Sequence, residues 1–155
     1  MIFAIDPGTD RSAWALMDGL RLVRFGIVAN EDMHDELGSC TEDVAIEMIA
    51  SYGMPVGAEV FETCVWIGRF AEMAYGKWTL IYRREVKATL CGNQRAGDAN
   101  VRRAILDLYP RTGDGATPQV GTKTKPGPLY GVRKDIWAAI GVGITAQIKA
   151  GELAL

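Results

Sequence analysis

The strongest indication of fold class lies in residues 1–29, MIFAIDPGTDRSAWALMDGLRLVRFGIVA. Its first apolar run, Met1–Ala4, leads into the turn Asp6-Pro7-Gly8, and apolar residues resume over Ser12–Met17 and again over Leu22–Ala29. Short apolar runs separated by turn residues are typical of strands joined by tight turns. The segment therefore predicts an antiparallel β-meander at the start of a sheet.

The remainder of the chain alternates strand-like and helix-like segments. Strands are predicted over 44–49 and 78–82, and helices over 58–75, 83–87, 98–108 and 135–149, with a short helix or loop over 31–41. The apolar stripe of 58–75 is wide enough to indicate burial on more than one side. The order β-β-β-loop-β-α-β-α-α predicts an α/β fold with a mixed five-stranded sheet flanked by helices.

Two further segments affect this prediction. Residues 110–131 mix proline and glycine with basic residues and predict a long irregular loop, which in a compact domain is either functional or disordered. The last helix tolerates Gly141 and Gly143, where close packing on a sheet favours small side chains. We therefore expect this helix to lie directly on the sheet.

Composition limits the class of protein. With 155 residues and 48% hydrophobic content, we expect one globular domain, 1–155. No apolar run approaches the ~18 residues of a membrane span and no charged leader is evident, so we expect a cytoplasmic protein without a membrane partner. Cys40, Cys64 and Cys91 lack a CxxC spacing, which argues against a disulfide framework or zinc site and favours buried thiols.

The charges are unevenly distributed along the chain. The net charge is −2, yet residues 1–76 hold 4 Lys and Arg against 13 Asp and Glu, whereas residues 77–134 hold 12 against 4, a local charge of +8. Clustered cations bind phosphates, so the asymmetry indicates an acidic catalytic side beside a basic nucleic-acid-binding side. Two oppositely charged solvated surfaces are the alternative.

Three acids stand at unusual positions. Asp6 ends an apolar strand, Glu47 lies between Ile46 and Met48, and Asp135 opens an apolar helix. A carboxylate at the edge of a core is costly unless it is paired or binds a cation. Mg²⁺ takes such oxygen ligands, and two ions together can clamp the attacking and leaving oxygens of a phosphodiester. The trio therefore predicts a metal-dependent nuclease.

Each acid also has a simpler explanation. Asp6 could be a turn residue before Pro7-Gly8, Asp135 could be favoured by the helix dipole, and Glu47 could be solvated on the polar face of its strand. The only histidine, His34, is more typical of a solvated surface than of a metal ligand. The three acids together are more informative than any one of them.

Four motifs in order carry a family resemblance. AIDPG (4–8), VAIE (44–47), VKATLCGNQRAGDANVRRAI (86–105) and DIWAAIGVGIT (135–145) resemble the RuvC-type Holliday-junction resolvases, especially the short forms of bacteriophages. The first motif alone is shared by many RNase H-like proteins. The ordered set covers nearly the whole chain and is much more specific.

The resemblance implies an RNase H-like fold, a homodimer, dependence on Mg²⁺ or Mn²⁺ with two ions, and nicking of four-way and other branched double-stranded DNA. Asp6, Glu47 and Asp135 match the family's metal-binding catalytic acids. Lys87 matches a lysine near the cleavage site, where a cation could stabilise charge developing on the phosphate. Tyr52 lies where family members place an aromatic residue that stacks at the junction, although it could equally be a packing residue.

The chain departs from the family pattern at two positions. Ala138 replaces a second acid on the last helix, so the fourth metal ligand is missing or comes from elsewhere; Glu62 is a candidate, although a helix-surface acid is the commoner explanation. Asp98 falls on a lysine position, so phosphate binding would pass to other cations. The candidate DNA-binding cations are Arg95, Arg102, Arg103, Arg111, Lys123, Lys125 and Lys134.

Three other functions remain open from the sequence. A related nuclease could act on RNA or RNA–DNA hybrids. A non-catalytic junction-binding protein would suit an incomplete set of acids. The actin-like ATPases and kinases share a D-x-G-T phosphate loop, matched by residues 6–9, but need two such domains where this chain holds one.

Overall fold

The computed structural model describes residues 1–155, and its elements follow the predicted order. They are β1 (Ile2–Asp6), β2 (Arg11–Asp18), β3 (Arg21–Ala29), the 3-10 turn η1 (Asn30–Asp32), α1 (Met33–Leu37), β4 (Asp43–Met48), α2 (Ala58–Met73), β5 (Trp78–Tyr82), α3 (Arg83–Cys91), α4 (Asp98–Asp107) and α5 (Ile136–Lys149). The helix predicted over 83–87 continues to Cys91, where Gly92 ends it in the left-handed conformation.

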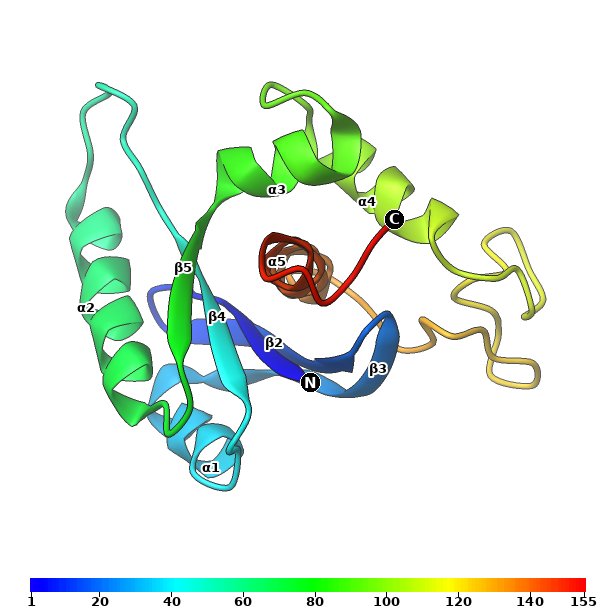
Figure 1. The fold of residues 1–155 in the computed structure, drawn as a ribbon, viewed down its shortest axis with the longest axis horizontal. Helices are drawn as coiled ribbons and strands as arrows, with labels where there is room; N and C mark the ends of the chain where they lie inside the picture. The colour runs from blue at the N-terminus through cyan, green and yellow to red at the C-terminus, as the bar shows by residue number, and fades with distance from the viewer.

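The strands form one mixed sheet in the order β3-β2-β1-β4-β5. Neighbours β1, β2 and β3 are antiparallel, which confirms the predicted meander, while β4 runs parallel to β1 and β5 parallel to β4. Figure 1 shows the resulting twisted sheet. Three adjacent parallel strands, β1, β4 and β5, therefore end at the same edge of the sheet.

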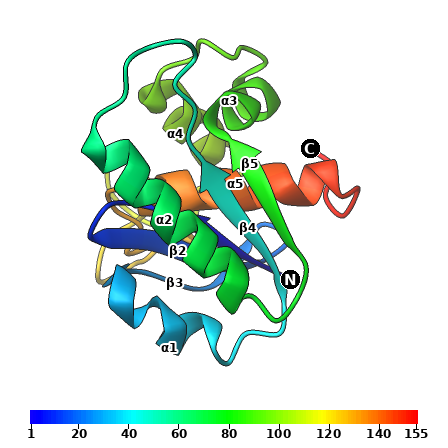
Figure 2. The same ribbon diagram turned by 90° about the vertical axis from the view of Figure 1, so that its left-hand side faces the viewer.

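Helices cover both faces of this sheet. α5 lies on one face with α3 and α4 beyond it, and α1 and α2 lie on the other (Figures 1 and 2). Along β1 the side chains alternate between two cores: Ile2 and Ala4 pack toward α5, whereas Phe3 and Ile5 pack toward α1 and α2. None of the helices has the length and hydropathy needed to cross a membrane.

Close packing of α5 depends on its two glycines, as expected. A Cβ atom on Gly143 would lie 2.6 Å from the sulfur of Met17, and one on Gly141 would lie 3.0 Å from Cγ1 of Val86. These contacts are tighter than ordinary van der Waals packing. The glycines therefore let α5 sit directly against β1, β2 and α3.

The burial of α2 differs from the prediction. Only Thr63, Ile67 and Phe70 are fully buried, and Phe61 and Val65 on another face are 62% and 57% exposed. The expectation of burial on more than one side is wrong because the sheet covers a single side of this helix (Figure 2). The apolar surface formed by Phe61 and Val65 is therefore exposed to solvent in the single chain.

The segment 110–131 is irregular but ordered. The amide of Gly113 donates to the carbonyl of Pro118, and the amide of Leu129 donates to the carbonyl of Gln119, whose side chain is buried. The segment projects beyond α4 (Figure 1). The three cysteines are unpaired thiols, but only Cys40 is fully buried; Cys64 and Cys91 are half-buried, contrary to the prediction.

Candidate active site

Asp6 and Glu47 lie side by side at the ends of two parallel strands. Ile5 of β1 is in register with Ile46 of β4, so the two acids are the next pair along the strands. Asp6 continues the face of Ala4, and Glu47 continues the face of Ala45, both of which pack in the core beneath α5. The alternation of each strand thus points both carboxyl groups toward the same helix.

Burial shapes the ionisation of this pair. Glu47 is only 7% exposed. Burial, the charge of Glu47 and a hydrogen bond with its side chain raise the pKa of Asp6 to about 9, and burial also raises the pKa of Glu47. In the absence of a bound cation, the pair therefore keeps a proton that a carboxyl group exposed to water would release.

Asp135 faces the pair from the start of α5. It is exposed, and its negative charge contributes to the raised pKa of Asp6. It occupies the N-cap position but makes no capping hydrogen bond with its side chain, so a simple capping role has no support in the structure. The structure thus brings the predicted trio into one neighbourhood, with two members in contact and the third opposite them.

A cleft of about 540 Å³ opens beside Asp135. Arg83, Asp98 and Arg102 line it, together with Lys134 and Ala138. The guanidinium of Arg102 lies 4.8 Å from the ring centre of Trp137, which fixes this cation on the cleft wall. Of the predicted DNA-binding cations, Arg102 and Lys134 therefore line the cleft beside Asp135.

A second cleft, of about 440 Å³, is entirely free of carboxylates. It is lined by Tyr52, Arg83, Arg84, Lys87, Gln94 and Arg95. The charge of Lys87 acts on Glu47 and partly offsets the rise that burial causes in the pKa of that acid, so the lysine lies near the acidic pair. Tyr52 is 58% exposed, has a φ of 50° and lies under Arg84, 5.7 Å from the guanidinium carbon to the ring centre. Its exposure does not support the packing alternative.

The remaining predicted residues lie away from both clefts. Arg103 pairs with Asp107 on α4, and Lys125 pairs with Asp114 on the 110–131 segment. Arg111 and Lys123 are exposed on the same segment. Glu62 is exposed on α2 and makes no hydrogen bond or ion pair with Asp6 or Glu47, so the structure does not bring it to the pair. His34 is exposed, as predicted.

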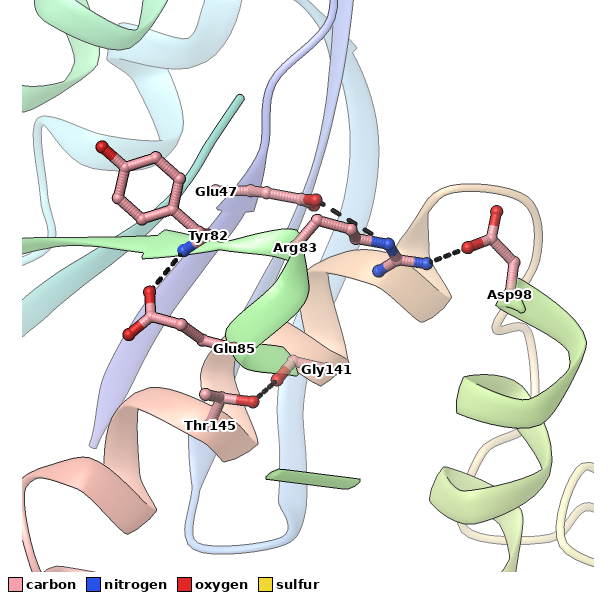
Figure 3. A network of polar contacts seen from close by, with 7 residues as sticks. All are labelled: Glu47, Tyr82, Arg83, Glu85, Asp98, Gly141 and Thr145. Carbon is pink, nitrogen blue, oxygen red and sulfur yellow. Dashed lines mark hydrogen bonds and ion pairs between the residues drawn. The ribbon is translucent and has the colours of Figure 1, made fainter. Parts of the chain in front are cut away.

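Arg83 belongs to the site although the sequence analysis did not select it. It is the first residue of α3, directly after β5, and its Nε lies 3.9 Å from Oε1 of Glu47 while Nη2 lies 2.6 Å from Oδ1 of Asp98 (Figure 3). The only signal in the sequence is that Arg83 directly follows a predicted strand, 78–82; the pairing of that strand with the strand of Glu47 is seen only in the structure. The sequence alone does not indicate the contact with Asp98.

A buried polar network holds the turn that follows Asp6. Ser12 donates a hydrogen bond to Oδ1 of Asn30 at 2.6 Å, Nδ2 of Asn30 donates to the carbonyl of Gly8 at 2.9 Å, and the amide of Gly8 donates to Ser12 at 3.1 Å. Asn30 and Ser12 are almost inaccessible. The network, which the sequence analysis missed, fixes the chain immediately after the first catalytic candidate.

The acids suit a cation held jointly by protein and substrate. No group of three or more His, Cys, Asp or Glu side chains is close enough to hold a metal ion by itself. Mg²⁺ is commonly held by one or two carboxylates, with waters and substrate phosphates completing its shell. Asp6 and Glu47 supply such a pair, and the oxygen-only donor set fits Mg²⁺ or Mn²⁺ and argues against zinc.

The mixed sheet in the order β3-β2-β1-β4-β5, flanked by helices on both faces, defines the RNase H-like fold class. Within that class, the chain has the RuvC type of fold. It is similar to the structure of Thermus thermophilus RuvC, with a TM-score of 0.62, and to T. thermophilus RuvC in complex with a Holliday junction substrate, with a TM-score of 0.65. Each likeness covers 97% of this chain and 96% of the other at 16% identity.

The sequence comparisons add nothing to this likeness. No protein-family model matches the chain, and no curated protein sequence matches it.

Proposed function

We propose that this chain is a structure-selective DNA endonuclease that cleaves Holliday junctions and other branched DNA by metal-dependent hydrolysis. The observation that carries the proposal is the buried contact of Asp6 and Glu47 at the ends of parallel strands, with Asp135 opposite. Two buried acids in contact are destabilising by themselves, which is the expected property of a site built to bind a cation.

Asp6 and Glu47 would hold the divalent ion, and Asp135 would complete the site from α5. When bound, the ion supplies an activated water and neutralises charge on the phosphate. Asp6 and Glu47 must give up their shared proton on binding, so the affinity for metal should rise with pH. The two-ion arrangement implied by the resemblance needs Asp135 and the DNA itself as further ligands.

The two clefts would hold the DNA backbone on either side of the acids. The second cleft offers four cations and no carboxylate, and the first adds Arg102, Arg133 and Lys134. Lys87 is near enough to Glu47 to stabilise negative charge at the scissile phosphate. Tyr52, exposed at the tip of the β4–α2 loop, could stack on a base that is unpaired at the branch point. Backbone contacts and branch geometry, more than base contacts, would select the substrate.

A homodimer through α2 would place two such sites on one junction. Phe61 and Val65 lie one helical turn apart, and both side chains are more than half exposed. A second copy of this chain could cover that surface with its own α2, because a two-fold interface joins the same patch on both subunits. Two sites could then make the paired nicks that resolve a four-way junction.

The proposal is tested on labelled four-way junction, flap, duplex and RNA–DNA hybrid in Mg²⁺ and in Mn²⁺. We expect the wild type to cleave the junction in preference to duplex, and Asp6→Asn to cleave none of the substrates. Asp10→Asn, an exposed neighbour, is the matched control and should retain activity. Preference for the hybrid would replace the proposal with an RNase H activity.

A second candidate, a junction-binding protein without catalysis, is favoured by one observation. The cleft-lining position one helical turn after Asp135 holds Ala138 in place of an acid, and no three acids gather closely. Tight junction binding with no cleavage in either metal would establish this candidate and contradict the nuclease.

A further inference from the structure

We propose that Arg83 is a catalytic cation that contacts the scissile phosphate, and that Asp98 is the residue that positions it. The inference rests on the proposed function and assigns a residue role within the same site. Its starting point is an acid, Asp98, at a position where a phosphate-binding cation was expected. The structure shows that this acid binds a cation from another helix (Figure 3).

The backbone places Arg83 beside the reacting centre. Asp6 ends β1, Glu47 lies near the end of β4, and Arg83 directly follows β5, so three adjacent parallel strands deliver these side chains to one edge of the sheet. Its Cα lies at the first position of α3, whose helical backbone fixes the direction of the side chain. Arg83 also lines both clefts, which none of the other cations does.

Asp98 restricts the remaining freedom of the side chain. It accepts a hydrogen bond from Nη2 at 2.6 Å, and Nε of Arg83 stays 3.9 Å from Glu47, too long for a hydrogen bond. Asp98 is itself 81% exposed, whereas Arg83 is only 25% exposed. The aspartate therefore reaches in from the surface of α4 and holds a largely buried guanidinium at the wall between the clefts.

The donors of Arg83 are not all used within the protein. Nη1 is buried and has no hydrogen-bond partner. An arginine that served only as an internal ion pair would be expected to satisfy its buried donors, since unpaired buried N–H groups are costly. A phosphate offers several acceptor oxygens and accepts bidentate hydrogen bonds from a guanidinium. Because Arg83 lines both clefts, a rotation of the side chain that brings Nη1 out of its buried position would let it donate to a phosphate in the adjoining cleft.

The test separates contact with phosphate from a structural ion pair. We would measure single-turnover cleavage of a four-way junction, junction binding in EDTA as a function of salt, and thermal stability. The variants are Arg83→Ala, Arg83→Gln, Arg83→Lys, Asp98→Ala and the Arg83→Ala/Asp98→Ala double variant. Arg21→Ala, which breaks an exposed Arg–Asp pair at the β2–β3 turn, is the matched control.

Arg83→Ala and Arg83→Gln should lower the cleavage rate by about 10²- to 10³-fold, the loss typical of removing one preorganised donor. They should also reduce the salt slope, which is the slope of the logarithm of the binding constant against the logarithm of the salt concentration. A reduction of about one is expected for one lost phosphate contact. Arg83→Lys should recover part of the rate. Asp98→Ala should lower the rate with an unchanged salt slope, and should have no further effect in the Arg83→Ala background.

Three results would overturn the inference: cleavage by both neutral variants within about threefold of wild type, an unchanged salt slope in both, or an undiminished effect of Asp98→Ala in the double variant. An inactive wild type would instead contradict the proposed function. In that case the salt slopes still decide whether Arg83 contacts DNA.

Discussion

Asp135 and Ala138 lie three residues apart and line the same cleft from one face of α5. Ala138 is the only residue from Ile136 to Gln147 that is not fully buried. The side chain at this position therefore borders the cleft beside Asp135 and is not fully covered. This geometry makes position 138 the place where a further carboxylate could join the site.

We expect Ala138→Asp to tighten Mn²⁺ binding by at least about tenfold, because affinity for hard cations follows the number of charged ligands. Calorimetric titration of the DNA-free protein measures this directly. Ala138→Asn, similar in size but uncharged, is the control and should leave the affinity near that of wild type. Equal affinities for the Asp and Asn variants would show that position 138 does not reach the metal.

The raised pKa of Asp6 predicts a pH-dependent stability. Because burial and Glu47 raise this pKa from 3.8 to about 9, the folded state keeps a proton that the unfolded state releases between these values. Stability of the metal-free protein should therefore fall as pH rises through this window. Asp6→Asn removes this titration, so in EDTA it should be more stable than wild type by at least about 1 kcal/mol near neutral pH.

Urea unfolding at several pH values in EDTA measures the difference. The advantage of Asp6→Asn over wild type should widen with pH, and Asp10→Asn should show no such trend. A variant that is less stable than wild type throughout would mean that Asp6 is not held in the unfavourable environment described above.

The network behind Asp6 should contribute to stability. Asn30→Ala leaves the Ser12 hydroxyl and the Gly8 carbonyl without their partner, and orphaned buried groups cost roughly 1–3 kcal/mol each. We expect a loss of at least about 2 kcal/mol in the free energy of unfolding. Asn93→Ala, an exposed asparagine in a turn, is the control and should change stability by less than about 0.5 kcal/mol.

The exposed face of α2 should control assembly. We expect Phe61→Glu to convert a dimer to a folded monomer in sedimentation experiments, since the side chain is 62% exposed in a single chain. Val23→Glu on β3 is a matched control, because this apolar residue is also exposed. A wild-type protein that is monomeric at high concentration would contradict the proposed interface.

The sequence predicted the sheet and the acids because both depend on short-range patterns. Short apolar runs separated by turn residues in 1–29 are enough to identify three strands, and an acid between Ile46 and Met48 is conspicuous in an apolar run. The face of α2 that would be covered was not predictable, because an apolar stripe does not reveal on which side the sheet will lie.

Arg83 was missed for a similar reason. It is one of twelve cations in its segment, and its partners Glu47 and Asp98 lie 36 and 15 residues away in the chain. Only the parallel pairing of β4 with β5 brings it to the acids. The position of Arg83 therefore depends on long-range strand pairing, which local sequence patterns do not reveal.

Anomalous diffraction from crystals soaked in Mn²⁺ would show whether Asp6 and Glu47 hold the metal. We expect a peak between the carboxyl groups of Asp6 and Glu47, and no such peak in crystals of Glu47→Gln. If Mn²⁺ supports junction cleavage but the soaked crystals show no peak at this pair, or a peak elsewhere, Asp6 and Glu47 do not hold the catalytic metal.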